Sequence, residues 1–237
     1  MKIRIKFSKQ GYMKFVGHLD IMRYFQKAMR RGKINIRYSE GFSPHQIMSF
    51  AAPLGVGITS NGEYLDIEVT DQDTPSFTSQ TMTKSLNQVM VEGIQILSCR
   101  KLPDTSKNAM SIVCAADYTL RFRERAILED LEMFFEKLSA FYSQDQIMIT
   151  KKTKRSQRKL DLKPLIYHLE RRGNAVFMQV SAGSGDNIKP ELVMESFYES
   201  QNWEYPPFGF LIQREEVYGH DQAGNKIPLE EFGENIE

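Results

Sequence analysis

The sequence of 237 residues has little cysteine and no long apolar run, and each shortage excludes a class of protein. The two cysteines, Cys99 and Cys114, are too few for a disulfide framework or for a cysteine-ligated zinc or iron–sulfur centre, so we interpret them as reduced, buried thiols. The first residues, MKIRIKFSKQG, lack the apolar stretch of a signal peptide, and no segment approaches the roughly 20 apolar residues of a membrane span. We therefore expect a globular cytoplasmic protein.

Acidic residues are nearly absent from the amino-terminal region, although the net charge of the whole chain is only +1. Between residues 2 and 37 the acidic side chain is Asp20, and the basic ones are Lys2, Arg4, Lys6, Lys9, Lys14, Arg23, Lys27, Arg30, Arg31, Lys33 and Arg37. A second basic run occupies residues 151–159, and acidic residues gather after residue 214. Such segregation is typical of a surface that binds a polyanion, and it favours nucleic acid as a partner.

Hydrophobic periodicity predicts an α+β fold, a tandem of two ferredoxin-like (βαββαβ) units with antiparallel sheets. In the first unit, residues 1–102, strand patterns at 3–7, 34–38, 64–69 and 94–99 combine with helix patterns at 18–31 and 78–91. The order recurs in the second unit, residues 112–219, with strands at 117–122, 175–180 and 209–217, helices at 126–141 and 191–200, and a segment around 161–169 that fits a strand or a short helix.

Two polar stretches complete this organisation. Residues 103–111 contain Pro, Asp, Ser and Asn with little apolar content, so we expect a linker between the units. Residues 220–237 are polar and acidic, and we expect them to form a hairpin followed by a frayed tail.

The first third of the chain carries four motifs: Gly17-His18-Leu19-Asp20, Arg30-Arg31, Ser39-Glu40-Gly41-Phe42-Ser43-Pro44-His45, and a segment that runs from Gly57 through Ser60 to Glu63-Tyr64. Through these motifs the sequence resembles the radical-SAM-linked proteins, a family found fused to, or encoded beside, radical SAM proteins. Residues 160–166 and 213–219 match it more weakly. Two positions depart from the family pattern: Gly17 stands in place of a serine whose hydroxyl would cap the helix, and Gln46 replaces a frequent proline.

The resemblance implies a radical SAM protein as a partner. It does not make this chain a radical SAM enzyme, because two cysteines cannot hold the iron–sulfur cluster of such an enzyme. The resemblance implies no cofactor for the chain itself.

Helical spacing places several cations on one face of the helix predicted at 18–31, and this face is the candidate nucleic-acid surface. We assign to it Arg23, Lys27, Arg30 and Arg31, together with Arg37, Tyr38 and Phe42. Basic side chains contact phosphates, and aromatic rings stack on unpaired bases. Tyr12, Phe15 and Tyr24 lie among the same cations. The alternatives are a solvated helix face for the cations and core packing for the aromatic residues.

His18, Asp20 and His45 are the candidates for catalysis. Imidazole titrates near neutral pH, so His18 and His45 suit acid–base cleavage of RNA, whereas Asp20 near a helix amino terminus also serves to complement the helix dipole. The alternative for the histidines is a pair of polar side chains with satisfied hydrogen bonds. We expect no metal site, because no spacing adds a third strong ligand.

These patterns favour a protein without catalysis of its own, an RNA-binding accessory that presents a structured RNA, such as a tRNA or rRNA, to a radical SAM-type modification enzyme. One alternative is a metal-independent ribonuclease that uses His18 and His45. The other is a protein-interaction module for a radical SAM enzyme that binds no nucleic acid.

Overall fold

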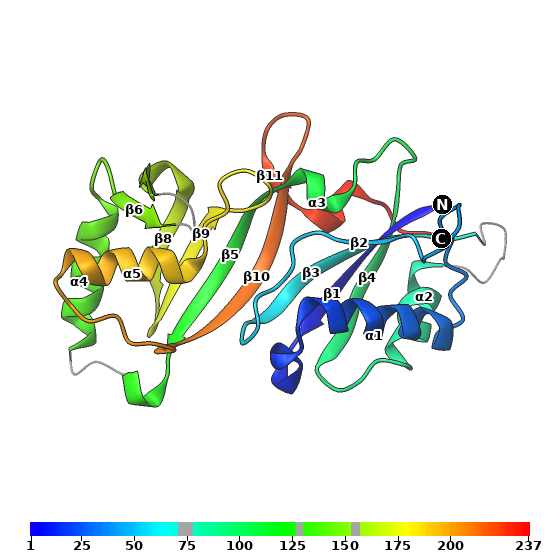
Figure 1. Cartoon of the computed structure of the whole chain (residues 1–237), viewed down its shortest axis with the longest axis horizontal. Coiled ribbons are helices and arrows are strands. Elements are labelled where there is room, and N and C mark those ends of the chain that lie inside the picture. Colours follow the sequence, from blue (N-terminus) through cyan, green and yellow to red (C-terminus); the bar gives the residue numbers. More distant parts are fainter. Residues whose placement is uncertain (71–77, 127–129, 153–156) are drawn as a thin grey trace. The chain divides into compact units, whose positions relative to one another are not determined.

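Two βαββαβ arrangements follow one another along the chain, and the structure is the predicted α+β fold. The computed structural model describes residues 1–70, 78–126, 130–152 and 157–237 (Figure 1). By compactness the chain divides into a first unit, residues 1–114 with 214–237, and a second unit, residues 115–213. The second unit is therefore inserted between two segments of the first. The strand predicted at 209–217, which we expected to close the second unit, contributes its residues from 214 onward to the first unit.

The first unit is an antiparallel sheet with the strand order β4-β1-β3 and with β2 beside β3. This is the ferredoxin-like order. Its elements are β1 (Lys2–Lys9), η1 (Gly11–Phe15), α1 (His18–Arg31), β2 (Met48–Phe50), β3 (Thr59–Glu68), α2 (Ser79–Asn87), β4 (Ile94–Leu102) and α3 (Ala109–Ile112), followed after the second unit by β11 (Lys226–Pro228) and η4 (Leu229–Phe232).

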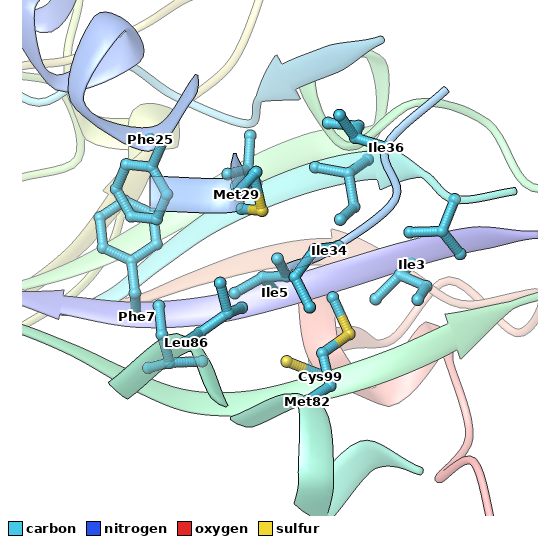
Figure 2. Close-up of a cluster of buried hydrophobic side chains, with 14 of the residues drawn as sticks. Ile3, Ile5, Phe7, Phe25, Met29, Ile34, Ile36, Met82, Leu86 and Cys99 are labelled. Carbon is cyan, nitrogen blue, oxygen red and sulfur yellow. The ribbon is translucent and has the colours of Figure 1, made fainter. Parts of the chain in front are cut away.

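Both long helices of the first unit pack on one face of its sheet. The predicted alternation in β1 holds on this face, because Ile3, Ile5 and Phe7 are buried against Phe25 of α1 and Leu86 of α2 (Figure 2). The Phe7 and Phe25 rings have centroids 4.7 Å apart. Burying one such side chain contributes about 1.5–3 kcal/mol, so this shared core is what fixes α1 on the sheet.

The buried stripe of α1 consists of Ile21, Phe25, Ala28 and Met29. Leu19 has the spacing of a core residue but is 62% exposed, because it lies in the first turn beyond the edge of this stripe. The helix ends at Gly32, where an added Cβ would lie 3.3 Å from both the Ala28 carbonyl oxygen and Leu86 Cδ2. Close packing against α2 is therefore what favours glycine there.

Two predicted elements of the first unit differ from the observed ones. Residues 34–38 form isolated bridges and no strand, because the chain bends at Ile34, where the Ile36 N–H donates to the Ile34 carbonyl. In the sheet, β2 takes the place of the predicted strand. The helix expected over 78–91 ends at Asn87, whose side-chain amide bonds the backbone of Ile96 at 2.8 and 2.9 Å. Asparagine favours such backbone pairing over a helix interior.

The two polar stretches are also more structured than expected. The stretch 103–111 includes the start of α3, and Ala109 is fully buried there. The hairpin after residue 220 is present as β10 paired with β11, but the acidic tail is not frayed. It packs on the first unit, where the Ser79 N–H donates to the Ile236 carbonyl and Lys101 pairs with Glu234 through backbone hydrogen bonds.

The second unit repeats the ferredoxin-like order with one insertion. Its strands run in the order β5-β9-β8, with the first residues of β10 beside β5, and the hairpin β6–β7 is inserted between α4 and β8. The elements are β5 (Val113–Phe122), η2 (Glu124–Ala126), α4 (Leu131–Tyr142), β6 (Met148–Lys152), β7 (Gln157–Asp161), η3 (Lys163–Leu165), β8 (Ile166–Arg172), β9 (Ala175–Ser181), α5 (Pro190–Ser200) and β10 (Phe210–His220).

The ambiguous segment around 161–169 contains both a short helical turn, η3, and the strand β8. The helix predicted from residue 126 starts at Leu131, and residues 127–129 lie outside the described residues, as do residues 153–156 of the second basic run. In the part of the chain that the structure describes, no helix is long and apolar enough to cross a membrane.

Candidate nucleic-acid interface

The outer face of α1 carries the cations that the sequence assigned to it. Arg23, Lys27, Arg30 and Arg31 are all exposed, whereas the opposite stripe of the helix is buried. Arg23 lies 3.4 Å from Asp20, a weak contact between two exposed side chains, and Arg31 donates to the Val89 carbonyl. The face is therefore open to solvent and retains its positive charge.

The basic side chains of β1 do not belong to this surface. Arg4 is 1% exposed and forms two hydrogen bonds with the Asp66 carboxylate, at 2.7 and 2.9 Å. Lys6 contacts Glu216 and Glu230, each at 2.6 Å. Asp66 of β3 neutralises Arg4, and the acidic residues Glu216 and Glu230 near the end of the chain neutralise Lys6, so these cations of β1 add no open basic surface.

These contacts set the protonation of the Lys6 cluster. Burial alone would lower the pKa of Lys6, but hydrogen bonds and charges from Glu216 and Glu230 raise it above its ordinary value. Burial opposes ionisation of Glu230, yet Lys6 and Ser98 hold the pKa of Glu230 below its ordinary value. Burial also raises the pKa of Tyr64, and Glu216 raises it further. The cluster is thus a set of matched internal charges, unlike the open face of α1.

A loop of residues 38–46 lies next to α1 and carries three of the assigned residues. Its base is closed by the Ser39 N–H, which donates to the His45 carbonyl, and by the His45 N–H, which donates to Ser39 Oγ at 3.1 Å. Gly41 has a φ of 107°, which a residue with a side chain rarely adopts, so the turn favours glycine. Phe42 beside it is fully exposed, and Tyr38 is 46% exposed.

Aromatic side chains near the start of α1 are also exposed. Tyr12 is 90% exposed and Phe15 is 60% exposed, and Lys14 Nζ lies 5.2 Å from the Phe15 ring centroid. Tyr24 is half-buried, with its ring 5.7 Å from the Arg31 guanidinium. Core packing, the alternative for these residues, therefore does not apply to Tyr12 and Phe15.

His18 lies at the first position of α1, after the cap residue Gly17, which forms no side-chain capping bond. Its ring packs edge-on against Phe50, with centroids 5.2 Å apart, and lines a small pocket of about 10 Å³. Asp20 is exposed and contacts Arg23. His18 is thus a half-buried aromatic neighbour of the core.

His45 lines a different pocket, and none of the residues that line it also lines the His18 pocket. Among the residues that the structure describes, the two imidazoles therefore line separate pockets. Among the described residues, no group of three His, Cys, Asp or Glu side chains is arranged to hold a metal ion.

Sequence reasoning missed a buried charged group beneath the start of α1. Glu63 of β3 and Arg214 of β10 form hydrogen bonds at 2.5–2.8 Å, and their side chains are 6% and 5% exposed. Lys9 is buried nearby and donates to the Val16 carbonyl. Burial lowers the pKa of Lys9, Glu63 opposes that shift and Arg214 adds to it. The segment 213–219, which matches the family pattern weakly, contains Arg214, the partner of Glu63. This weak match was the signal in the sequence that pointed to the pair.

Two of the sequence motifs therefore have a structural explanation. Ser60 Oγ accepts a hydrogen bond from the Gly62 N–H, and Tyr64 donates to Glu216 at 2.7 Å. Together with the Glu63–Arg214 pair, these contacts join the motif 57–64 to the segment 213–219. Within the described residues, no ion pair links the loop 39–45 or the cationic face of α1 to a distant segment, so these two segments are the exposed part of the pattern.

A family model described as "Uncharacterized protein conserved in bacteria (DUF2344)" matches residues 2–190. The chain belongs to this family. The match includes α1, the loop 38–46 and the motif 57–64. These DUF2344 residues thus contain the whole candidate interface. The family description does not mention radical SAM proteins.

No curated protein matches the DUF2344 chain. Among solved structures it is similar to a chain of the "Crystal Structure of a Cbf5-Nop10-Gar1 Complex", with 10% sequence identity and a TM-score of 0.44. The similarity covers 93% of this chain and 51% of that chain, so the present chain spans about half the length of its match.

Proposed function

We propose that this DUF2344 protein binds a structured RNA on the cationic face of α1 and presents it to a radical SAM-type modification enzyme. The observation that carries the RNA part is the exposure of Arg23, Lys27, Arg30 and Arg31 along one face of a helix whose other face is fixed in the core. A row of cations on one helix face suits phosphate groups at successive positions of an RNA backbone.

The exposed aromatic side chains support RNA over a purely electrostatic partner. Phe42, Tyr38, Tyr12 and Phe15 lie on segments next to α1, and their exposed rings can stack on bases that are not paired. Single-stranded loops and bulges of a structured RNA offer both features, a phosphate backbone and unstacked bases. The ribonuclease alternative receives less support, because His18 and His45 line different pockets.

The RNA part is tested by changing Arg23, Lys27 and Arg30 together to Ala. We expect the affinity for a tRNA transcript at low salt to fall by about 3 kcal/mol or more, since each charge-assisted phosphate contact contributes about 1 kcal/mol or more. Fluorescence anisotropy measures the affinity, and the slope of log K against log salt should become shallower by roughly 0.7–0.9 for each lost contact.

The matched control removes three exposed cations that belong neither to α1 nor to the loop 38–46. Lys84, Lys101 and Lys189 are exposed, and their combined change to Ala alters the net charge equally. This variant should keep most of the wild-type affinity. Equal losses in the two triple variants would mean that the binding follows net charge and not the α1 face.

The partner part of the proposal comes from the family resemblance and has its own test. Crosslinking in cells followed by purification identifies the bound RNA by sequencing and the associated proteins by mass spectrometry. We expect a radical SAM enzyme in the same sample as the RNA. RNA without such an enzyme would remove the partner and leave the RNA-binding proposal standing.

A further inference from the structure

A pocket of about 300 Å³ opens beside the base of the loop 38–46. Side chains from the start of β1, from β2, from β3 and from the stretch 102–108 line it, and His45 is the residue through which it meets the loop. All of these segments belong to the first unit. The volume is at the small end of the range for pockets that hold small molecules.

Two lysines and a histidine are among the side chains that line this pocket. Lys2 Nζ donates to the carbonyls of Asp104 at 2.8 Å and Ser106 at 3.2 Å, which fixes its position and leaves one N–H. Lys107 is exposed and forms no ion pair within the described residues. His45 Nδ1 lies 2.9 Å from Ser39 Oγ, which holds the ring, so Nε2 is the ring nitrogen left for a ligand.

The two carboxylates that line the pocket face arginines. Asp66 bonds Arg4 at 2.7 and 2.9 Å and accepts the Ala109 N–H at 2.7 Å. Glu68 lies 3.4 Å from Arg37. An anion that enters therefore meets Lys2, Lys107 and His45 at the rim, while the acidic side chains are already compensated.

The remaining lining is mixed, with the polar residues Ser49, Ser106 and Asn108 beside the apolar residues Ile47, Met48, Ile67 and Leu102. Ile67 and Met48 pack in the core and Leu102 is buried, so the half-buried Ile47 is the apolar side chain that offers a surface for an uncharged, flat part of a ligand. Inorganic phosphate would leave this surface uncovered, and a purely apolar ligand would leave the cations without a partner. A ligand with a flat ring at one end and a phosphate at the other satisfies both.

The geometry points to a site for one nucleotide, with the base against Ile47 and the phosphate at Lys2, His45 and Lys107. Its source is a free ribonucleotide or an unpaired nucleotide of an RNA. The unpaired nucleotide of an RNA rests on the proposed function. In that case the pocket and the RNA-binding surface act together, because His45 of the pocket and the exposed Phe42 belong to the same loop.

The first arm of the test uses free nucleotides. Calorimetric titration with AMP, GMP, CMP and UMP should show binding that adenosine and inorganic phosphate each lack, and Lys107→Ala should weaken it about tenfold, as expected for one charge-assisted contact. His45→Gln, which keeps a donor near the position of the imidazole Nε2, should retain more affinity than His45→Ala. Lys101→Ala is the matched control and should bind as the wild type does. Circular dichroism verifies that each variant is folded.

The second arm uses two RNA hairpins that differ by one bulged nucleotide. The wild type should prefer the bulged hairpin, and His45→Ala with Lys107→Ala should reduce that preference about tenfold. The triple variant of Arg23, Lys27 and Arg30 should weaken binding of both hairpins alike.

The outcomes separate this site from the proposed function. Nucleotide binding that depends on Lys107, without any RNA binding, supports the site with free nucleotide as its ligand and contradicts the RNA-binding proposal. RNA binding that depends on α1 but shows no bulge preference, together with no nucleotide binding, overturns the site and leaves the RNA-binding proposal intact.

Discussion

Removing the charge of Glu63 tests how the first unit tolerates its buried cations. Glu63→Gln keeps the shape of the side chain but leaves the Arg214 guanidinium, 5% exposed, without its counter-ion. It also removes the negative charge that opposes the lowering of the pKa of Lys9. Breaking a buried ion pair from one side costs about 3–5 kcal/mol, because the remaining charge stays desolvated.

That cost is a large part of the stability of a folded protein, which is about 5–15 kcal/mol. At about 2–4 °C for each kcal/mol, the midpoint of thermal unfolding should fall by about 6–20 °C. Urea unfolding followed by far-UV circular dichroism measures the free energy, and the same signal followed against temperature gives the midpoint.

The matched control is an ion pair of the same chemistry at the surface. Glu132 contacts Arg171 at 2.6 and 2.7 Å but is 73% exposed, so Glu132→Gln should lower the free energy of unfolding far less than Glu63→Gln does. Replacing both buried partners, Glu63→Leu with Arg214→Met, should cost less than Glu63→Gln alone. If Glu63→Gln and Glu132→Gln lose the same free energy, burial of the pair does not control its contribution and the reasoning is refuted.

Two further predictions concern protonation and thiol reactivity. Because the pKa of Glu230 is lowered in the folded state, its carboxylate stabilises the fold above the ordinary value of 4.5, and this contribution is lost as the pH falls through the lowered pKa. Glu230→Gln should therefore reduce the loss of unfolding free energy between about pH 5 and pH 3, and an unchanged pH dependence would contradict the role of the Lys6–Glu230 contact. Burial raises the pKa of Cys99 to about 11, so a thiol reagent at pH 8 should label the half-buried Cys114 first and Cys99 only on unfolding. Equal labelling rates in the native protein would show that Cys99 is accessible.

Local patterns predicted the fold well, because they depend on residues close together in the chain. The alternation of Ile3, Ile5 and Phe7 identified the core face of β1, and the spacing of Arg23 and Lys27 identified an exposed face of α1. Both patterns follow from the geometry of a single strand or helix, so no knowledge of distant partners was needed.

The polar interior was not predictable in this way. Arg4 and Lys6 have the pattern of outward-facing side chains, but Leu229, Glu216 and Glu230 cover them from the other end of the sequence. The Glu63–Arg214 pair joins residues 151 positions apart. A periodicity argument assigns a side chain to a face of the sheet, but it does not say whether another segment covers that face.

The candidate interface was predicted in part for the same reason. The exposed positions on α1 and in the loop 38–46 follow from local sequence, whereas the pocket beside His45 combines Lys2 with Lys107, which are brought together only by the sheet and by the packing of the stretch 102–108. His18 and His45 looked equivalent as polar residues of two motifs. Their different surroundings, an aromatic core edge and an open pocket, depend on tertiary structure.

The insertion of residues 115–213 between two segments of the first unit sets an order for folding on the ribosome. All residues of the second unit emerge before residues 214–237, so this later-encoded unit is able to become complete first. Until then the nascent first unit lacks the carbonyl and carboxylate partners of Arg4 and Lys6, which come from Leu229 and Glu230. Translation must therefore continue past β11 before Lys6 gains both of its carboxylate partners, whereas Arg4 meets Asp66 within the residues that are translated first.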